Sequence, residues 1–184
     1  LDNNQNLLIC TPTASGKTLI AEIAATKSIY EKVGKAIYIV PLKALASEKY
    51  KEFKERYSDL DIALSIGETD SADNYLSKYD LIVTTSEKLD SEIRHDAAWL
   101  KDVKVVIIDE IHLLTDPGRG PTLEILITIL KELLKGVRII GLSATIGNSQ
   151  EFASWLDAKL VFDTWRPVEL HKGIHLDGKT EYYK

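Results

Sequence analysis

Residues 11–18, with the sequence T-P-T-A-S-G-K-T, constrain the fold of this chain more than any other stretch. A short apolar run at residues 7–10 precedes them, and apolar residues at helical spacing follow them over residues 19–32. A buried strand, a loop of small residues ending in Gly-Lys-Thr, and a helix together form the context that a phosphate-binding P-loop requires. The sequence therefore predicts a nucleotide site near the start of the chain.

The backbone N–H groups of such a loop, together with the following helix N-terminus, form a concave anion site. Gly16 is expected where the backbone must approach a phosphate closely. We expect Lys17 to reach the β- and γ-phosphates of ATP and the Thr18 hydroxyl to bind Mg²⁺. The residues expected to bind ATP are Thr13, Ala14, Ser15, Gly16, Lys17 and Thr18. The general P-loop pattern has a glycine where this chain has Thr11, which argues against a generic P-loop kinase. The alternative to a phosphate-binding loop is an ordinary turn before a helix.

The size and composition of the chain suit one globular domain with a sizeable core, since it has 184 residues, 45% of them hydrophobic and 28% charged. The longest apolar runs are of strand length or contain charges, so no membrane-spanning helix is expected. The first five residues lack the basic start of a signal peptide. The chain has one cysteine, which is consistent with a reducing cytoplasm. This residue, Cys10, lies in a predicted buried strand, which favours a packing role. The absence of methionine suggests an excised fragment.

Short apolar runs alternate with helical patterns along the rest of the chain. Strands are predicted at residues 36–40, 61–66, 81–85, 103–109, 137–142, 160–162 and 168–174, and further helices at residues 45–57, 86–95, 122–135 and 149–156. Gly34 is expected to follow the first helix as its C′ residue, and Ser86 to cap another. The helix at residues 122–135 is apolar around most of its circumference, so we expect it to be largely buried. Residues 67–74 read as a polar loop.

This alternation implies right-handed βαβ units and a mainly parallel sheet covered by helices on both faces. Ligands of such sheets bind at the carboxyl ends of the strands, and every candidate motif here follows a predicted strand. One α/β domain accounts for the whole chain. The net charge of −5 does not itself indicate nucleic-acid binding, although local patches decide that property.

Residues 105–112, V-V-I-I-D-E-I-H, supply the acidic half that a P-loop site needs. We expect Asp109 to hold Mg²⁺ opposite Thr18, and Glu110 to act as the general base or to orient the water that attacks the γ-phosphate. A polar turn after a strand is the alternative.

His112 has two interpretations, either a structural histidine or a link between the nucleotide and the next loop. That loop contains Ser143, Ala144 and Thr145, which also follow a strand. The hydroxyls of Ser143 and Thr145 either join this coupling or cap the following helix.

Taken together, these residues resemble superfamily-2 helicases. P-T-A-S-G-K-T, D-E-I-H and S-A-T resemble motifs I, II and III, while P-L-K-A-L at residues 41–45 and T-T-S-E-K-L-D at residues 84–90 are similar to motifs Ia and Ib. D-E-I-H-L-L followed by G-R-G-P-T-L-E resembles the superkiller-like group. With E-K-L-D-S-E-I-R-H and W-R-P-V-E-L, the chain looks closest to the archaeal DNA-repair helicases related to the helicase domain of DNA polymerase theta. The resemblance covers nearly the whole chain.

The resemblance implies a three-layer RecA-like P-loop domain that binds ATP and Mg²⁺. It also implies ATP hydrolysis coupled to 3′→5′ translocation on single-stranded DNA, with unwinding of branched or forked duplexes during DNA repair. The residues it implies to face DNA are Pro41, Lys43, Thr84, Thr85, Arg119 and Gly120. If the resemblance is set aside, Lys43 is interpreted as the start of a charged stretch typical of a solvated helix face. Arg119 is then interpreted as a turn residue.

Two parts of such an enzyme are not found in the sequence: an upstream adenine-sensing segment and a second motor domain with its arginine fingers. Residues 168–184 are expected to begin the linker towards that second domain. Because these parts are missing, we expect the 184 residues alone to bind nucleotide weakly, to hydrolyse it poorly and not to unwind DNA. The protein is expected to be a monomer. Two alternatives stay open, an RNA helicase of the same group and a nucleotide-binding switch without productive hydrolysis; Glu110 argues against the switch.

Overall fold

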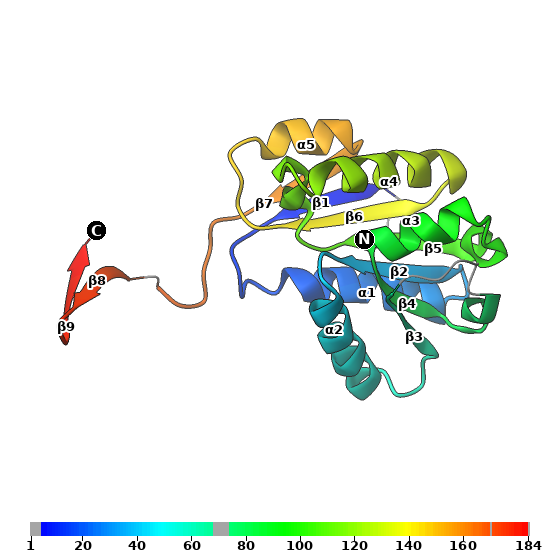
Figure 1. Cartoon of the computed structure of the whole chain (residues 1–184), viewed down its shortest axis with the longest axis horizontal. Coiled ribbons are helices and arrows are strands. Elements are labelled where there is room, and N and C mark those ends of the chain that lie inside the picture. The colour runs from blue at the N-terminus through cyan, green and yellow to red at the C-terminus, as the bar shows by residue number, and fades with distance from the viewer. Residues whose placement is uncertain (1–4, 68–73, 170, 184) are drawn as a thin grey trace.

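A sheet of seven parallel strands lies between two layers of helices in the computed structural model, which describes residues 5–67, 74–169 and 171–183 (Figure 1). The strand order is β3-β4-β2-β5-β6-β1-β7. The strands are β1 (Asn6–Cys10), β2 (Lys35–Val40), β3 (Ile62–Ser65), β4 (Leu81–Thr85), β5 (Val103–Ile108), β6 (Arg138–Ser143) and β7 (Ala158–Phe162). The expected α/β fold with a mainly parallel sheet is confirmed.

Helices cover both faces of this sheet. One face carries α1 (Lys17–Tyr30) and α2 (Lys43–Arg56), and the other carries α3 (Ser86–Arg94), α4 (Gly120–Leu133) and α5 (Ser149–Trp155). The described residues also form short 3₁₀ helices, which are η1 (Asn74–Lys78), η2 (Ala98–Asp102) and η3 (Ile111–Thr115). None of the helices in the described part of the chain is long and apolar enough to cross a membrane.

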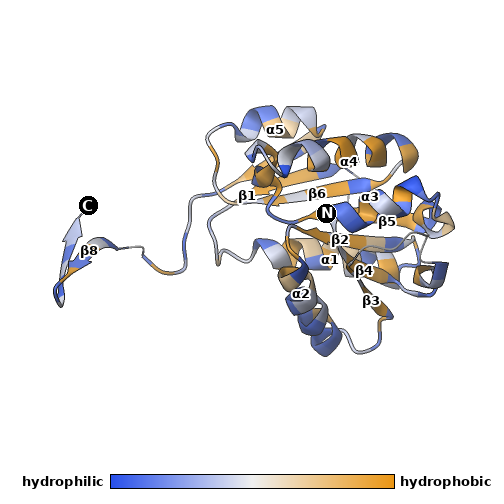
Figure 2. Ribbon diagram, in the orientation of Figure 1, coloured by the Kyte–Doolittle hydropathy of each residue, from blue (hydrophilic) through white to orange (hydrophobic). Residues whose placement is uncertain are grey.

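Two hydrophobic clusters form the core, one on each face of the sheet. Because successive residues of a strand point to opposite faces, Tyr38 and Ile107 join the cluster under α1 and α2. Ile37 and Ile108 join the cluster under α3, α4 and α5. Strands buried on both faces must be apolar along their whole length, and Figure 2 shows this contrast with the more polar outer surfaces of the helices.

A buried carboxylate holds α1 against α2. The Glu22 side chain is only 2% exposed, and its Oε2 accepts hydrogen bonds from Arg56 Nη1 and, at 2.9 Å, from Tyr57 Oη. The helix that follows the P-loop is therefore tied to the helix that starts at Lys43.

Two of the predicted helix ends are wrong. Gly34 is not a C′ residue, because α1 ends at Tyr30 and Lys32 adopts the left-handed conformation with φ 56°. A glycine is still needed at position 34, where a Cβ would lie 2.5 Å from the Asp102 carbonyl oxygen. The cap of α3 is Thr85, whose Oγ1 accepts from the Lys88 N–H at 3.4 Å, and not Ser86.

Two further expectations fail in the second half of the chain. Helix α4 is buried on one face only, since Ile125 and Leu133 are 55% and 50% exposed. The single strand predicted at residues 168–174 is instead an exposed antiparallel hairpin of β8 (Lys172–Leu176) and β9 (Lys179–Tyr183), which Figure 1 shows apart from the sheet. Within the predicted polar loop, residues 68–73 lie outside the described part, as do residues 1–4 at the N-terminus.

Candidate nucleotide-binding site

A pocket of about 430 Å³ lies at the carboxyl ends of β1 and β5. Its lining residues are Thr13, Ala14, Gly16, Lys17, Thr18, Val40, Leu45, Lys49, Asp109 and Glu110. Residues that are some 90 positions apart in the sequence are thus brought to one cavity, because β1 and β5 both pair with β6 in parallel. The structure places the predicted loop and the predicted acidic pair together.

The loop is shaped by two left-handed residues, Ala14 with φ 66° and Gly16 with φ 87°. Nothing in the protein lies within 4 Å of the position that a Cβ of Gly16 would take, so backbone conformation explains this glycine and the space above it is open. The Ser15 hydroxyl does not line the pocket; it hydrogen-bonds the Thr11 hydroxyl at 2.6 Å. Thr11, which stands where the general pattern has glycine, therefore anchors the loop through its hydrogen bond with Ser15.

Lys17 and Thr18 start helix α1 at the wall of the pocket. Lys17 is buried, with 8% of its surface exposed, so its ammonium faces the cavity walls more than bulk water. Behind it, Cys10 is fully buried, and burial raises the pKa of its thiol. The predicted packing role of Cys10 is confirmed, because a protonated and inaccessible thiol is a poor nucleophile.

Asp109 is held at both carboxylate oxygens. Its Oδ1 accepts from the Glu110 N–H at 2.9 Å, and its Oδ2 accepts from Tyr38 Oη at 2.9 Å. Burial is the main reason that the pKa of Tyr38 is raised far above its usual range, so the phenol remains a proton donor. The carboxylate is thus held in one orientation, and it lines the same pocket as the loop.

Glu110 has an uncommon backbone conformation for a non-glycine residue, with φ 50°. Such strain concentrates at functional sites, where the surrounding structure enforces it. Glu110 Oε2 lies 3.2 Å from His112 Nδ1, a distance suited to an ion pair. The contact lacks hydrogen-bond geometry, so His112 Nδ1 has no hydrogen-bond partner among the described residues.

The donor set of the pocket fits Mg²⁺ with ATP. Mg²⁺ prefers oxygen ligands and usually takes one or two from the protein, keeping waters and substrate phosphates for the rest. Thr18 supplies a hydroxyl and Asp109 a carboxylate in the same cavity, and Lys17 supplies the charge for phosphates. Among the described residues there is no cluster of three or more His, Cys, Asp or Glu side chains suited to a metal, which argues against an all-protein metal cage there.

The end of β6 and the loop after it carry the two hydroxyls for which coupling or helix capping is predicted. Ser143 is buried and donates to the Ala144 carbonyl oxygen at 2.7 Å, while Thr145 is exposed. Neither residue lines the nucleotide pocket. The capping alternative is wrong, because α5 begins only at Ser149 after Asn148, without a side-chain cap. Coupling through these two hydroxyls stays a prediction.

The residues expected to face DNA divide into two groups. Lys43 and Arg119 are exposed, and Pro41 and Arg119 line the same small depression next to Asp109. Thr84 and Thr85 are instead 1% and 2% exposed. The Thr84 hydroxyl donates to the Thr85 carbonyl oxygen and Thr85 caps α3, so their hydroxyls are engaged inside the protein and not presented at the surface.

Gly120, also expected at the DNA surface, is buried as the first residue of α4. A Cβ there would lie 2.2 Å from the Leu114 carbonyl oxygen. The glycine therefore allows α4 to start directly against η3.

We expect Gly120→Ala to lower the free energy of unfolding by about 1–3 kcal/mol, because the backbone must shift to relieve this overlap. Chemical denaturation of the variant measures the effect. Gly118→Ala is the matched control, since a Cβ at position 118 would meet only the Asp116 side chain, at 3.3 Å. Equal stability of the two variants would contradict the steric assignment.

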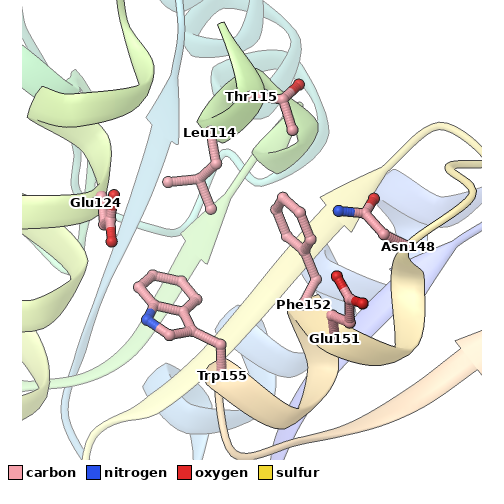
Figure 3. Close-up of a pocket in the computed structure, with 7 residues that line it drawn as sticks. All are labelled: Leu114, Thr115, Glu124, Asn148, Glu151, Phe152 and Trp155. Carbon is pink, nitrogen blue, oxygen red and sulfur yellow. The ribbon is translucent and has the colours of Figure 1, made fainter. Parts of the chain in front are cut away.

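The structure also reveals features that the sequence patterns missed. Lys49 lines the nucleotide pocket from α2, although its spacing is typical of a solvated helix face; its Nζ lies 2.8 Å from Glu52 Oε2. A second pocket of about 280 Å³ lies between η3, α4 and α5 (Figure 3). It is lined by Leu114, Thr115, Glu124, Asn148, Glu151, Phe152 and Trp155. No local sequence signal could have found it, because these residues come from separate segments.

Comparison with known proteins agrees with this geometry. The family model described as DEAD/DEAH box helicase matches residues 1–152. The protein named ATP-dependent DNA helicase Hel308 of Pyrococcus abyssi is 54% identical over 175 residues, which is 95% of this chain and 24% of that protein. The protein of the same name from Methanocaldococcus jannaschii is 58% identical over 189 residues, covering 99% of this chain and 16% of that protein. The chain thus spans a quarter or less of the length of these relatives.

Proposed function

Because the chain belongs to the DEAD/DEAH box helicase family, we propose that it is the ATP-binding motor domain of a longer ATP-dependent DNA helicase. The observation that carries the proposal is the single pocket in which the loop residues meet Asp109 and Glu110. The relatives that are 54% and 58% identical are named as DNA helicases, which supports DNA as the substrate.

The roles of the pocket residues follow from their chemistry. The backbone N–H groups at residues 13–16 and the N-terminus of α1 bind the phosphates, and Lys17 adds a charge to the β- and γ-phosphates. Thr18 and Asp109 hold Mg²⁺, which when bound offsets the phosphate charge. Glu110 orients the attacking water and accepts its proton. Its carboxylate faces His112, which links this step to the segment that follows β5.

DNA contact is proposed through the exposed cations beside this pocket. Lys43 begins α2 and Arg119 precedes α4, so both cations sit at the ends of helices. Single cations of this kind grip phosphates without reading base sequence. Pro41 and Arg119 share a depression with Asp109, which supports communication between the DNA strand and the nucleotide site.

The wider proposal concerns the rest of the polypeptide. Hydrolysis in this chemistry gains much of its rate from an arginine supplied by a second domain. We propose that residues 168–184 lead towards such a domain, and that the 184 residues alone turn over ATP poorly. The whole protein is proposed to act as a cytoplasmic monomer on forked DNA, moving 3′→5′.

Unwinding assays on the full-length protein test this function. Forked duplexes with a 3′ or a 5′ single-stranded tail are compared in the presence of ATP and Mg²⁺, together with RNA duplexes of the same sequence. We expect unwinding of the 3′-tailed DNA and little of the others. Faster unwinding of RNA would favour the RNA helicase instead, and no unwinding combined with tight ATP binding would favour a switch.

A further inference from the structure

We propose that Tyr38, which belongs to none of the recognised motifs, is a positioning residue for the magnesium-binding carboxylate of Asp109. The inference rests on the proposed function and adds a residue to its nucleotide site. Tyr38 lies in the middle of β2 and is fully buried.

The sheet register brings Tyr38 to Asp109. Tyr38 is opposite Ile107 across the β2–β5 pair, and Asp109 lies two residues beyond Ile107. Because strand side chains alternate, all three side chains point to the α1 face of the sheet. The Asp109 N–H bonds to the Ile39 carbonyl oxygen at 2.9 Å, which extends the ladder and fixes the backbone of Asp109.

The Tyr38 hydroxyl contacts the carboxylate proposed to hold the metal. It donates to Asp109 Oδ2 at 2.9 Å. The other carboxylate oxygen, Oδ1, accepts from the Glu110 N–H. With one donor on each oxygen the carboxylate cannot rotate freely, and each oxygen keeps a lone pair for a metal ion or its water.

The ring of Tyr38 is itself held rigidly. Phe53 of α2 meets it edge-on, with ring centroids 5.1 Å apart and an interplanar angle of 72°. A phenylalanine would fill the same space without the cost of burying a hydroxyl, so the hydroxyl is explained by its bond to Asp109. Since α2 begins at Lys43, a proposed DNA contact, the ring also connects the DNA-facing helix to the metal carboxylate.

Tyr38→Phe in the full-length protein tests the inference through the binding of a fluorescent, non-hydrolysable ATP analogue at a series of Mg²⁺ concentrations. We expect the apparent affinity for Mg²⁺ to fall about 10-fold or more, as is usual when a hydrogen-bond partner of a metal ligand is removed. Binding of the analogue without Mg²⁺ should not change. Excess Mg²⁺ should restore the ATP hydrolysis rate of the variant.

Tyr57→Phe is the matched control, because it removes another tyrosine hydroxyl that donates to a carboxylate at 2.9 Å, here that of Glu22. It should leave the Mg²⁺ dependence unchanged. If Tyr38→Phe and wild type need the same Mg²⁺ concentration, or if the two variants shift equally, the positioning role is wrong while the proposed function stands. Wild-type protein that binds no nucleotide at any Mg²⁺ concentration would instead overturn the proposed function and this inference together.

Discussion

Glu110→Gln is expected to lower the kcat of ATP hydrolysis in the full-length protein by about 10²–10⁴-fold, the usual contribution of a general base. Glutamine has the same shape but cannot accept the proton of the attacking water. Glu110 lines the pocket next to Asp109, and its backbone is held in a left-handed conformation that aims the side chain. Steady-state hydrolysis with saturating single-stranded DNA measures the effect.

Binding measurements distinguish a variant that hydrolyses ATP more slowly from one that binds ATP less tightly. The affinity for a non-hydrolysable ATP analogue should stay within about threefold of wild type in Glu110→Gln, since the phosphates are held by the loop and by Lys17. Lys17→Ala should lose both binding and hydrolysis. Unchanged turnover in Glu110→Gln would contradict the role of this carboxylate and favour a nucleotide-dependent switch.

Lys88→Met is expected to lower the free energy of unfolding by about 3–5 kcal/mol, because it removes one partner of a buried ion pair. Lys88 Nζ lies 2.7 Å from Glu92 Oε1, and both side chains are only 2% exposed. Trp99 Nε1 also donates to Glu92 Oε2, at 3.4 Å. The loss is a large part of the 5–15 kcal/mol typical of a domain, and urea denaturation at equilibrium measures it.

Two control variants isolate the buried charge. The double variant Lys88→Met with Glu92→Leu should be clearly more stable than Lys88→Met alone, because it removes both charges and leaves no buried charge unpaired. Arg94→Ala removes an exposed pair with Asp90 on the same helix, with Arg94 71% exposed, and should change stability little. If Lys88→Met is no less stable than Arg94→Ala, the buried Lys88–Glu92 pair does not make the expected contribution to stability.

The nucleotide pocket could be predicted because its signals are local. A strand followed by Gly16, Lys17 and Thr18, and another followed by Asp109 and Glu110, indicate their chemistry from neighbouring residues alone. Parallel strands then bring such ends to one edge of the sheet, whatever the details of packing.

The rest of the site depends on contacts between distant elements. Tyr38 reads as one apolar residue of a buried strand, and only the register with β5 reveals its bond to Asp109. Lys49 follows the spacing of a solvated helix face, yet it lines the nucleotide pocket. Burial of Thr84 and Thr85 is equally invisible in sequence, because threonine suits both a strand core and a surface.

The most direct test of the central claim, that residues 13–18 and Asp109 form a site for ATP with Mg²⁺, is an equilibrium titration of the full-length protein with a fluorescent ATP analogue. The account predicts saturable binding to one site in the wild-type protein, strengthened by Mg²⁺. It also predicts a loss of about tenfold or more in Lys17→Ala, equivalent to roughly 1.4 kcal/mol. Equal affinity of wild type and Lys17→Ala, or binding indifferent to Mg²⁺, would contradict it.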